Sequence, residues 1–197
     1  VDSVKIGMVS NSEIIKTIKE LLIEYKVTNI VLDPVMISKS GYYLLKPEAI
    51  EELKKLIKIV DIVTPNIPEA EELSNMKITC QEEMMEAALK INKLGAKNVL
   101  VKGGHRCNDA TDILYYDKRF ITLKGKRIST KNTHGTGCTL SSAIASYLAK
   151  GYSIEDSVKL SKEYITLAIK NSFPIGHGVG PVGHFIDLYE RANLSYK

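Results

Sequence analysis

The sequence has no apolar run close to the roughly 20 residues that a membrane-spanning helix needs, and it shows no signal peptide. It contains only three cysteines, Cys80, Cys107 and Cys138, and their spacing matches no paired zinc motif. An odd number of cysteines without such pairs favours a reducing compartment over a disulfide-bonded secreted protein. These absences argue against a membrane protein and predict a cytoplasmic location.

Basic residues do not gather into a patch either. Lys and Arg are interspersed with Glu and Asp, and the net charge is only +4. This pattern argues against nucleic-acid binding, although a mild positive balance suits an anionic substrate. The chain also lacks internal repeats, low-complexity segments and linkers. With 197 residues, of which 44% are hydrophobic and 25% charged, it is predicted to form a single domain over residues 1–197.

Short apolar segments alternate with amphipathic ones through residue 102. This alternation predicts an α/β fold with a mostly parallel central sheet covered by helices. The expected strands cover residues 4–9, 29–33, 61–64 and 98–102, followed by antiparallel strands at 112–117 and 119–123 and a further strand at 125–130. The expected helices cover residues 12–25, 47–60, 68–73, 79–94, 140–150, 153–171 and 182–191.

Capping residues predict where several of these helices begin. Ser12 is the expected N-cap of the first helix, Thr79 forms a capping-box pattern with Glu82, and Ser153 with Asp156 caps a later helix. The apolar face of the first helix is expected to hold Ile14, Ile18, Leu21, Leu22 and Tyr25.

A glycine-containing segment at residues 131–139 is the most informative stretch. Gly135 and Gly137 stand at an expected strand-to-helix turn, where backbone N–H groups can converge without interference from a Cβ atom. The N-terminus of the following helix adds partial positive charge. Cys138 lies in the first helical turn, where a thiolate is favoured. The segment therefore predicts an anion-binding site with a candidate base beside it.

Other polar residues follow the expected parallel strands. In such sheets ligands bind outside the carboxyl ends of the strands, which are occupied here by Asp33, by Asn66 and Glu69, and by the run Lys102-Gly103-Gly104. A lysine, carboxylates and a helix N-terminus are the groups that transfer a phosphoryl group from a nucleotide with Mg²⁺. The chain has neither a P-loop nor a dinucleotide-binding Gly-x-Gly-x-x-Gly motif after a strand.

Taken together, these motifs resemble hydroxymethylpyrimidine (phosphate) kinase of thiamine biosynthesis, a member of the ribokinase-like superfamily. The resemblance spans essentially the whole chain and implies a three-layer α/β/α fold. It is carried by five segments in the family's order: Asp33-Pro34-Val35-Met36, Pro65-Asn66-Ile67-Pro68-Glu69, Val101-Lys102-Gly103-Gly104-His105, Asn132-Thr133-His134-Gly135-Thr136-Gly137-Cys138-Thr139 and Gly176-His177-Gly178-Val179-Gly180-Pro181.

The resemblance also implies roles. Cys138 stands where sugar kinases of the superfamily carry an aspartate base, and the anion hole would comprise Gly135, Thr136, Gly137 and Cys138. The nucleotide phosphates would be bound by Asp33, Lys102 and Gly103, and by Asn66 and Glu69 of the Asn-x-x-Glu motif. Asp33 and Glu69 would hold Mg²⁺, and Met8, Val35 and Cys138 would contact the pyrimidine. ATP is the implied phosphoryl donor, and a homodimer the implied assembly.

One departure concerns the beginning of the chain. Family members carry an upstream strand and a glycine-rich loop that supply part of the substrate pocket, whereas this sequence starts at Val1 without an initiator methionine. The expectation is that the 197 residues lack this N-terminal segment, expose a sheet edge and have weak or no kinase activity alone.

Less specific interpretations of the same residues stay open at this point. Cys138 fits a small buried residue, Lys102 a solvated strand-end lysine, Asn66 a helix cap and Asp33 a turn residue. His105, His134, Cys107 and Cys138 would be a zinc site only with non-standard spacing. Two rival functions are a pyridoxal or pyridoxine kinase of the same fold and a non-catalytic nucleotide-binding module.

Overall fold

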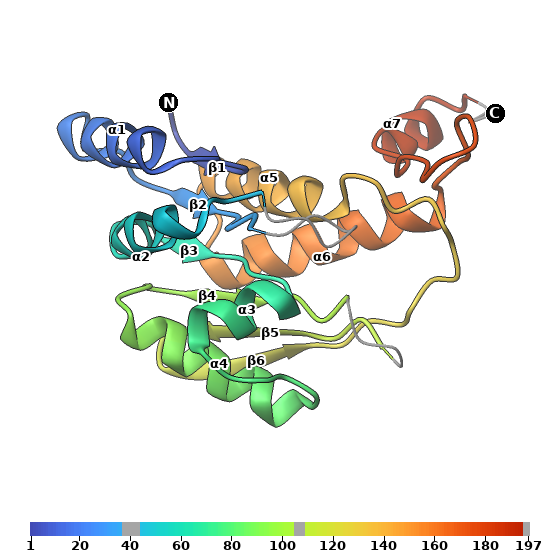
Figure 1. Cartoon of the computed structure of the whole chain (residues 1–197). Coiled ribbons are helices and arrows are strands. Elements are labelled where there is room, and N and C mark those ends of the chain that lie inside the picture. Colours follow the sequence, from blue (N-terminus) through green and yellow to red (C-terminus); the bar gives the residue numbers. More distant parts are fainter. Residues whose placement is uncertain (37–43, 105–108, 195–197) are drawn as a thin grey trace.

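The fold is built on a six-stranded sheet with the strand order β1-β2-β3-β4-β5-β6 (Figure 1). The computed structural model describes residues 1–36, 44–104 and 109–194. Strands β1 to β4 are parallel, whereas β5 and β6 form an antiparallel hairpin beside β4. The strands cover β1 (Val4–Ile6), β2 (Ile30–Leu32), β3 (Ile62–Val63), β4 (Val99–Val101), β5 (Asp112–Tyr116) and β6 (Arg119–Leu123).

Helices cover both faces of this sheet. On one face lie α1 (Ser12–Glu24), α2 (Ile50–Ile57), α3 (Ile67–Ser74) and α4 (Gln81–Lys93). A 3₁₀ turn at Pro47–Ala49 precedes α2. The other face is covered by α5 (Thr136–Ala149) and α6 (Ile154–Lys170). The short α7 (Ile186–Arg191) stands apart near the C-terminus (Figure 1). The three-layer α/β/α arrangement is the expected one.

Alternating side chains of the strands join the sheet to the two helical layers. In β2, Ile30 and Leu32 pack toward α1 to α4, whereas Val31 between them packs toward α5 and α6. Successive residues of a strand point to opposite faces, so a strand buried on both faces must be apolar throughout. This requirement explains why the parallel strands were recognisable as continuous apolar runs.

The first helix corrects two expectations. Its N-cap is Asn11, whose side chain accepts a hydrogen bond from the Ile14 amide at 3.0 Å, and not Ser12. Its buried residues are Ile15 and Leu22, while Ile14, Leu21 and Tyr25 of the predicted apolar face are exposed. Leu22 and the partly buried Ile18 do pack on the core as predicted. The apolar pattern of the sequence is wider than the stripe that packs on the sheet, so periodicity alone placed only part of the face correctly.

Two further predictions of local structure were wrong, and two were right. The capping box of α4 joins Cys80 and Glu83, one residue after the predicted pair. Residues 125–130 form no strand, because the hairpin ends the sheet at β6. The antiparallel hairpin itself is confirmed, and so is the Ser153 cap of α6, which accepts a hydrogen bond from the Asp156 amide.

None of the helices in the described part of the chain is long and apolar enough to span a bilayer.

Candidate active site

Backbone hydrogen bonds extend the parallel sheet beyond the ends of its strands. The Asp33 amide donates to Ile6 O at 2.9 Å, the Thr64 amide to Leu32 O at 2.9 Å, and the Lys102 amide to Pro65 O at 2.8 Å. This ladder aligns the residues that directly follow β2, β3 and β4. It therefore brings Asp33, Thr64 and Lys102 together at the carboxyl edge, as the rule for parallel sheets predicts.

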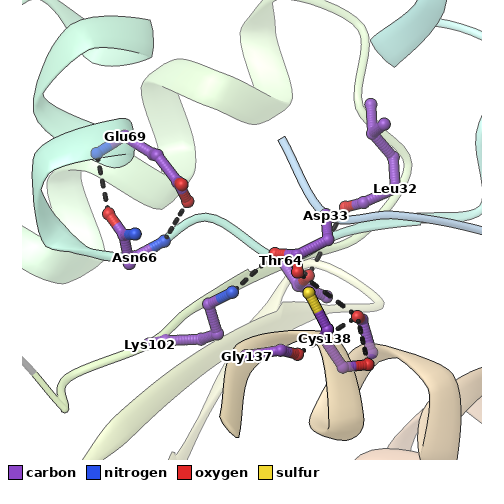
Figure 2. A network of polar contacts seen from close by, with 9 residues as sticks. Leu32, Asp33, Thr64, Asn66, Glu69, Lys102, Gly137 and Cys138 are labelled. Carbon is purple, nitrogen blue, oxygen red and sulfur yellow. Dashed lines mark hydrogen bonds and ion pairs between the residues drawn. The ribbon is translucent and has the colours of Figure 1, made fainter. Parts of the chain in front are cut away.

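An ion pair between Lys102 and Asp33 lies at the centre of this edge (Figure 2). The Lys102 Nζ atom is 2.6 Å from Asp33 Oδ1, and the two side chains are only 13% and 3% exposed. Thr64 Oγ1 donates to Asp33 Oδ1 at 3.3 Å, and Ser141 Oγ donates to Asp33 Oδ2 at 3.4 Å. A buried ion pair needs such additional hydrogen bonds because the loss of hydration is costly.

The N-terminus of α5 lies directly against this ion pair. A Cβ atom added to Gly137 would be 3.4 Å from Lys102 Nζ and 3.8 Å from Asp33 Oδ2. Helix geometry leaves the first amides of α5, including those of Gly137 and Cys138, without partners inside the helix. The positive end of the helix and the lysine ammonium therefore converge on one place, which is an arrangement that binds anions.

The turn before α5 has its own constraints. Gly135 is the N-cap and adopts a left-handed conformation with φ +77°, which favours glycine. Thr136 Oγ1 donates to Thr133 O at 2.8 Å and thereby closes the turn. The helix begins at Thr136, four residues before the predicted start. The structure thus places Gly135, Thr136 and Gly137 where the sequence pattern put an anion hole.

The glycine-rich tail holds this turn in place. Asn132 is buried, and its Oδ1 accepts a hydrogen bond from the Gly180 amide at 3.1 Å. The His134 amide donates to Gly180 O at 3.1 Å. A side chain at position 180 would overlap Phe173 O and the Asn132 side chain. This close approach gives the tail a structural role that the sequence pattern did not define.

Asn66 and Glu69 cap α3 beside the ion pair. The Asn66 amide donates to Glu69 Oε2 at 2.8 Å, and the Glu69 amide donates to Asn66 Oδ1 at 3.0 Å (Figure 2). Glu69 is only 2% exposed. Burial raises the pKa of its carboxyl to about 7, although Lys102 and the Asn66 backbone lower that pKa in part. The helix-cap interpretation is therefore correct for Asn66, and it leaves Glu69 as a carboxyl group that titrates near neutrality.

Gly103 is held by the hairpin of β5 and β6, which lies on the side of β4 away from β3. Its amide donates to Asp112 Oδ1 at 2.8 Å, and a Cβ atom at this position would overlap Thr111 O. The glycine after Lys102 is thus explained by close packing, and its amide has a partner within the chain. Nucleotide binding by Gly103 stays a prediction.

The remaining predicted residues lie around the same edge. Cys138 is an exposed free thiol in the first turn of α5 (Figure 2), next to a hollow of about 460 Å³ that runs along α5 toward Lys150. Met8 follows β1 and is 62% exposed, whereas Val35 follows β2 and is half-buried. Their contact with a pyrimidine stays a prediction.

The zinc alternative is not tested, because the described residues include only part of it. The described residues contain no group of three or more His, Cys, Asp and Glu side chains that could hold a metal ion. His105 and Cys107, which that alternative required, lie outside the described residues.

Sequence reasoning also missed several residues of the site. Thr64 and Ser141 bind Asp33, and Asp112 binds Gly103. The only available signals were the position of Thr64 directly after a strand and the position of Ser141 one helical turn after Gly137.

Known proteins share this architecture. A crystal structure of the ADP complex of pyridoxal kinase from Bacillus subtilis is 38% identical, superposes with a TM-score of 0.86, and matches 94% of this chain and 70% of its own. The fold and the site thus define a class, the ribokinase-like kinases, which transfer a phosphoryl group to a small acceptor.

Sequence comparison identifies the family to which the chain belongs within this class. The model of the family described as phosphomethylpyrimidine kinase matches residues 1–183. The hydroxymethylpyrimidine/phosphomethylpyrimidine kinase of Haemophilus influenzae is 43% identical over 93% of this chain and 70% of its own length. The thiamine biosynthesis bifunctional protein ThiED of Geobacter sulfurreducens is 46% identical over 94% of this chain, which spans only 38% of that relative. The chain belongs to the phosphomethylpyrimidine kinase family.

The pKa of Glu69 predicts how stability depends on pH. Between its ordinary pKa of 4.5 and about 7, the folded chain holds a proton that the unfolded chain has lost. The free energy of unfolding should therefore fall as pH rises through this window, by about 3 kcal/mol in total. In Glu69→Gln this part of the slope should disappear, as measured by urea unfolding from pH 4.5 to 8 without nucleotide. The matched control is Glu72→Gln, an exposed residue of the same helix, and equal slopes in the two variants would contradict the assignment.

Proposed function

We propose that this chain carries the phosphoryl-transfer site of a hydroxymethylpyrimidine/phosphomethylpyrimidine kinase. The reaction moves the γ-phosphoryl group of one ATP to the hydroxymethyl oxygen of 4-amino-5-hydroxymethyl-2-methylpyrimidine. The γ-phosphoryl group of a second ATP then goes to the resulting monophosphate, which gives the diphosphate. The observation that carries the proposal is the Lys102–Asp33 ion pair beneath the N-terminus of α5, in a chain that matches this family over residues 1–183.

Lys102 and the amides of α5 stabilise the transferring group. The ammonium of Lys102 has three N–H donors, of which the contact with Asp33 Oδ1 uses one, so the others are available to phosphate oxygens. The Gly137 and Cys138 amides add fixed dipoles that need no reorganisation during the reaction. Asp33 holds the ammonium in place.

Cys138 accepts the proton of the acceptor alcohol. It lies in the first turn of α5, where the positive end of the helix stabilises a negative charge on an adjacent base. The thiol is exposed, so an acceptor can reach it. As the alcohol oxygen bonds to phosphorus, its proton passes to the Cys138 thiolate, which becomes the thiol, and ADP leaves with the electron pair of the broken P–O bond.

Residues of this edge also fit a Mg²⁺ ion. Glu69 is a carboxyl whose pKa burial raises to about 7, and oxygen ligands of this kind suit Mg²⁺. Asp33, in contrast, is already engaged by Lys102, Thr64 and Ser141. Glu69 is thus the better candidate ligand of the two, and a bound ion would supply charge neutralisation for the nucleotide phosphates.

A cytoplasmic location and a homodimer complete the proposal. Two free cysteines, Cys80 and Cys138, suit a reducing compartment. Helix α1 exposes Ile14, Leu21 and Tyr25, and neighbouring apolar side chains on a surface suit an interface with a second copy.

The homodimer predicts the mass of the protein in solution. Sedimentation equilibrium should give twice the mass of one chain, and Leu21→Glu should reduce the measured mass to that of one chain. The mass of one chain for the parent protein would contradict the dimer.

The role of Cys138 predicts a separation of catalysis from binding. In a preparation that phosphorylates the pyrimidine alcohol, Cys138→Ala should lower kcat by about 10²-fold or more, because general base catalysis contributes about that much. The dissociation constant for ADP should change less than threefold. Cys80→Ala, which removes the capping cysteine of α4, is the matched control. Near-normal kcat in Cys138→Ala would refute the base assignment.

The acceptor distinguishes the first rival function. The structural similarity to a pyridoxal kinase at a TM-score of 0.86 keeps pyridoxal as an alternative, since both acceptors are aromatic rings with a hydroxymethyl arm. We expect kcat/KM for the pyrimidine alcohol to exceed that for pyridoxal at least tenfold. The reverse order would establish the rival, and ADP binding without phosphorylation of either alcohol would support a non-catalytic nucleotide-binding module.

A further inference from the structure

A second buried ion pair joins β5 to α6, on the side of β4 away from Asp33. Lys162 Nζ is 2.6 Å from Asp112 Oδ2, and the side chains are only 16% and 4% exposed. Lys162 Nζ also donates to Ala110 O at 2.6 Å. The proposed reaction uses neither residue. A desolvated lysine and aspartate at this depth are costly to bury, so their presence beside the active site calls for a physical reason.

Asp112 connects this pair to the backbone of the active site. While its Oδ2 binds Lys162, its Oδ1 accepts the hydrogen bond from the Gly103 amide at 2.8 Å, which belongs to the peptide unit that follows Lys102. On the other side, the Lys102 amide donates to Pro65 O. The backbone of Lys102 is therefore fixed from β3 on one side and from β5 on the other.

The charges of Asp112 and Lys162 also act on the Lys102 ammonium. Lys102 lowers the pKa of both Glu69 and Asp112, so its ammonium is attracted by these two carboxyl groups as well as by Asp33. Lys162 neutralises Asp112 directly. Without Lys162, a charged Asp112 would compete with Asp33 for the Lys102 ammonium, because unbalanced charges attract strongly in a buried setting.

We propose that Asp112 and Lys162 are positioning residues for Lys102. Asp112 fixes the backbone after Lys102, and Lys162 cancels the Asp112 charge so that the Lys102 ammonium stays on Asp33 beneath the N-terminus of α5. This inference rests on the proposed function, since it assigns the pair an effect on nucleotide phosphates. A pair that only joined α6 to β5 would change the stability of the fold and leave nucleotide affinity unchanged.

The chain offers a matched control for that distinction. Arg119 and Glu155 form another 2.6 Å ion pair between the hairpin and α6, but on the surface, with Arg119 60% exposed. Arg119→Met thus removes a contact between the same two parts of the structure without touching Gly103. The affinity measurement compares four proteins: the parent, Arg119→Met, Lys162→Met and the double variant Asp112→Asn/Lys162→Met.

The first measurement is ADP affinity by calorimetry at pH 8, which favours the charged carboxylate, with folding of each variant verified by circular dichroism. Lys162→Met should bind ADP at least tenfold more weakly. The double variant should bind within threefold of the parent, because the asparagine amide oxygen still accepts from the Gly103 amide and carries no charge. Arg119→Met should match the parent. Parent-like affinity of Lys162→Met, or a double variant as weak as Lys162→Met, would overturn the proposal.

The second measurement does not depend on nucleotide binding. The proton–nitrogen NMR signal of the Lys102 ammonium, assigned by its loss in Lys102→Gln, should shift in Lys162→Met and return toward the parent position in the double variant and in Lys162→Arg. An unshifted signal in Lys162→Met would overturn the positioning role. If the parent binds no ADP, the proposed function fails on its own, and this signal alone decides the role of the pair.

Discussion

The contact between Lys102 and Asp33 is the interaction on which the rest of the site depends. Two oppositely charged side chains give up most of their hydration at the edge of the sheet, which is favourable only with additional hydrogen bonds. Those bonds come from Thr64 after β3 and from Ser141 of α5. The ion pair therefore links three strand ends to the helix whose N-terminus faces the ligand, and it fixes the lysine where a phosphate would bind.

The surroundings of Lys102 contain more negative than positive charge. Asp33, Glu69 and Asp112 are all buried, whereas the ammonium groups that contact Asp33 and Asp112 belong to Lys102 and Lys162. Burial raises the pKa of Glu69 to about 7, although the charge of Lys102 lowers that pKa in part. A cation bound with the nucleotide would balance the remaining charge, and Lys162, in the proposed role, keeps the Asp112 carboxylate from drawing Lys102 away.

Much of this arrangement could be predicted from the sequence. The continuous apolar strands indicated a parallel sheet, and the rule for strand ends correctly brought Asp33, Lys102 and Gly137 together, although their catalytic roles are still predictions. The strand at 125–130 was wrong, and the apolar face of α1 was right at Ile18 and Leu22 but wrong at Ile14, Leu21 and Tyr25. Tertiary packing decides which segments join a sheet and which side of a helix is buried. Ser141 and Lys162 were missed because only the folded chain brings them to their partners.

The central claim is that Lys102, held by Asp33 beneath α5, binds the phosphates of a nucleotide. The most direct test is the affinity of the chain for ADP by calorimetry, compared between the parent and a Lys102→Gln variant that is shown to be folded. Charged hydrogen bonds of this kind contribute about 1.5–3 kcal/mol, so the account predicts that the variant binds ADP about 10- to 100-fold more weakly. Equal affinity of the two proteins for ADP would contradict it.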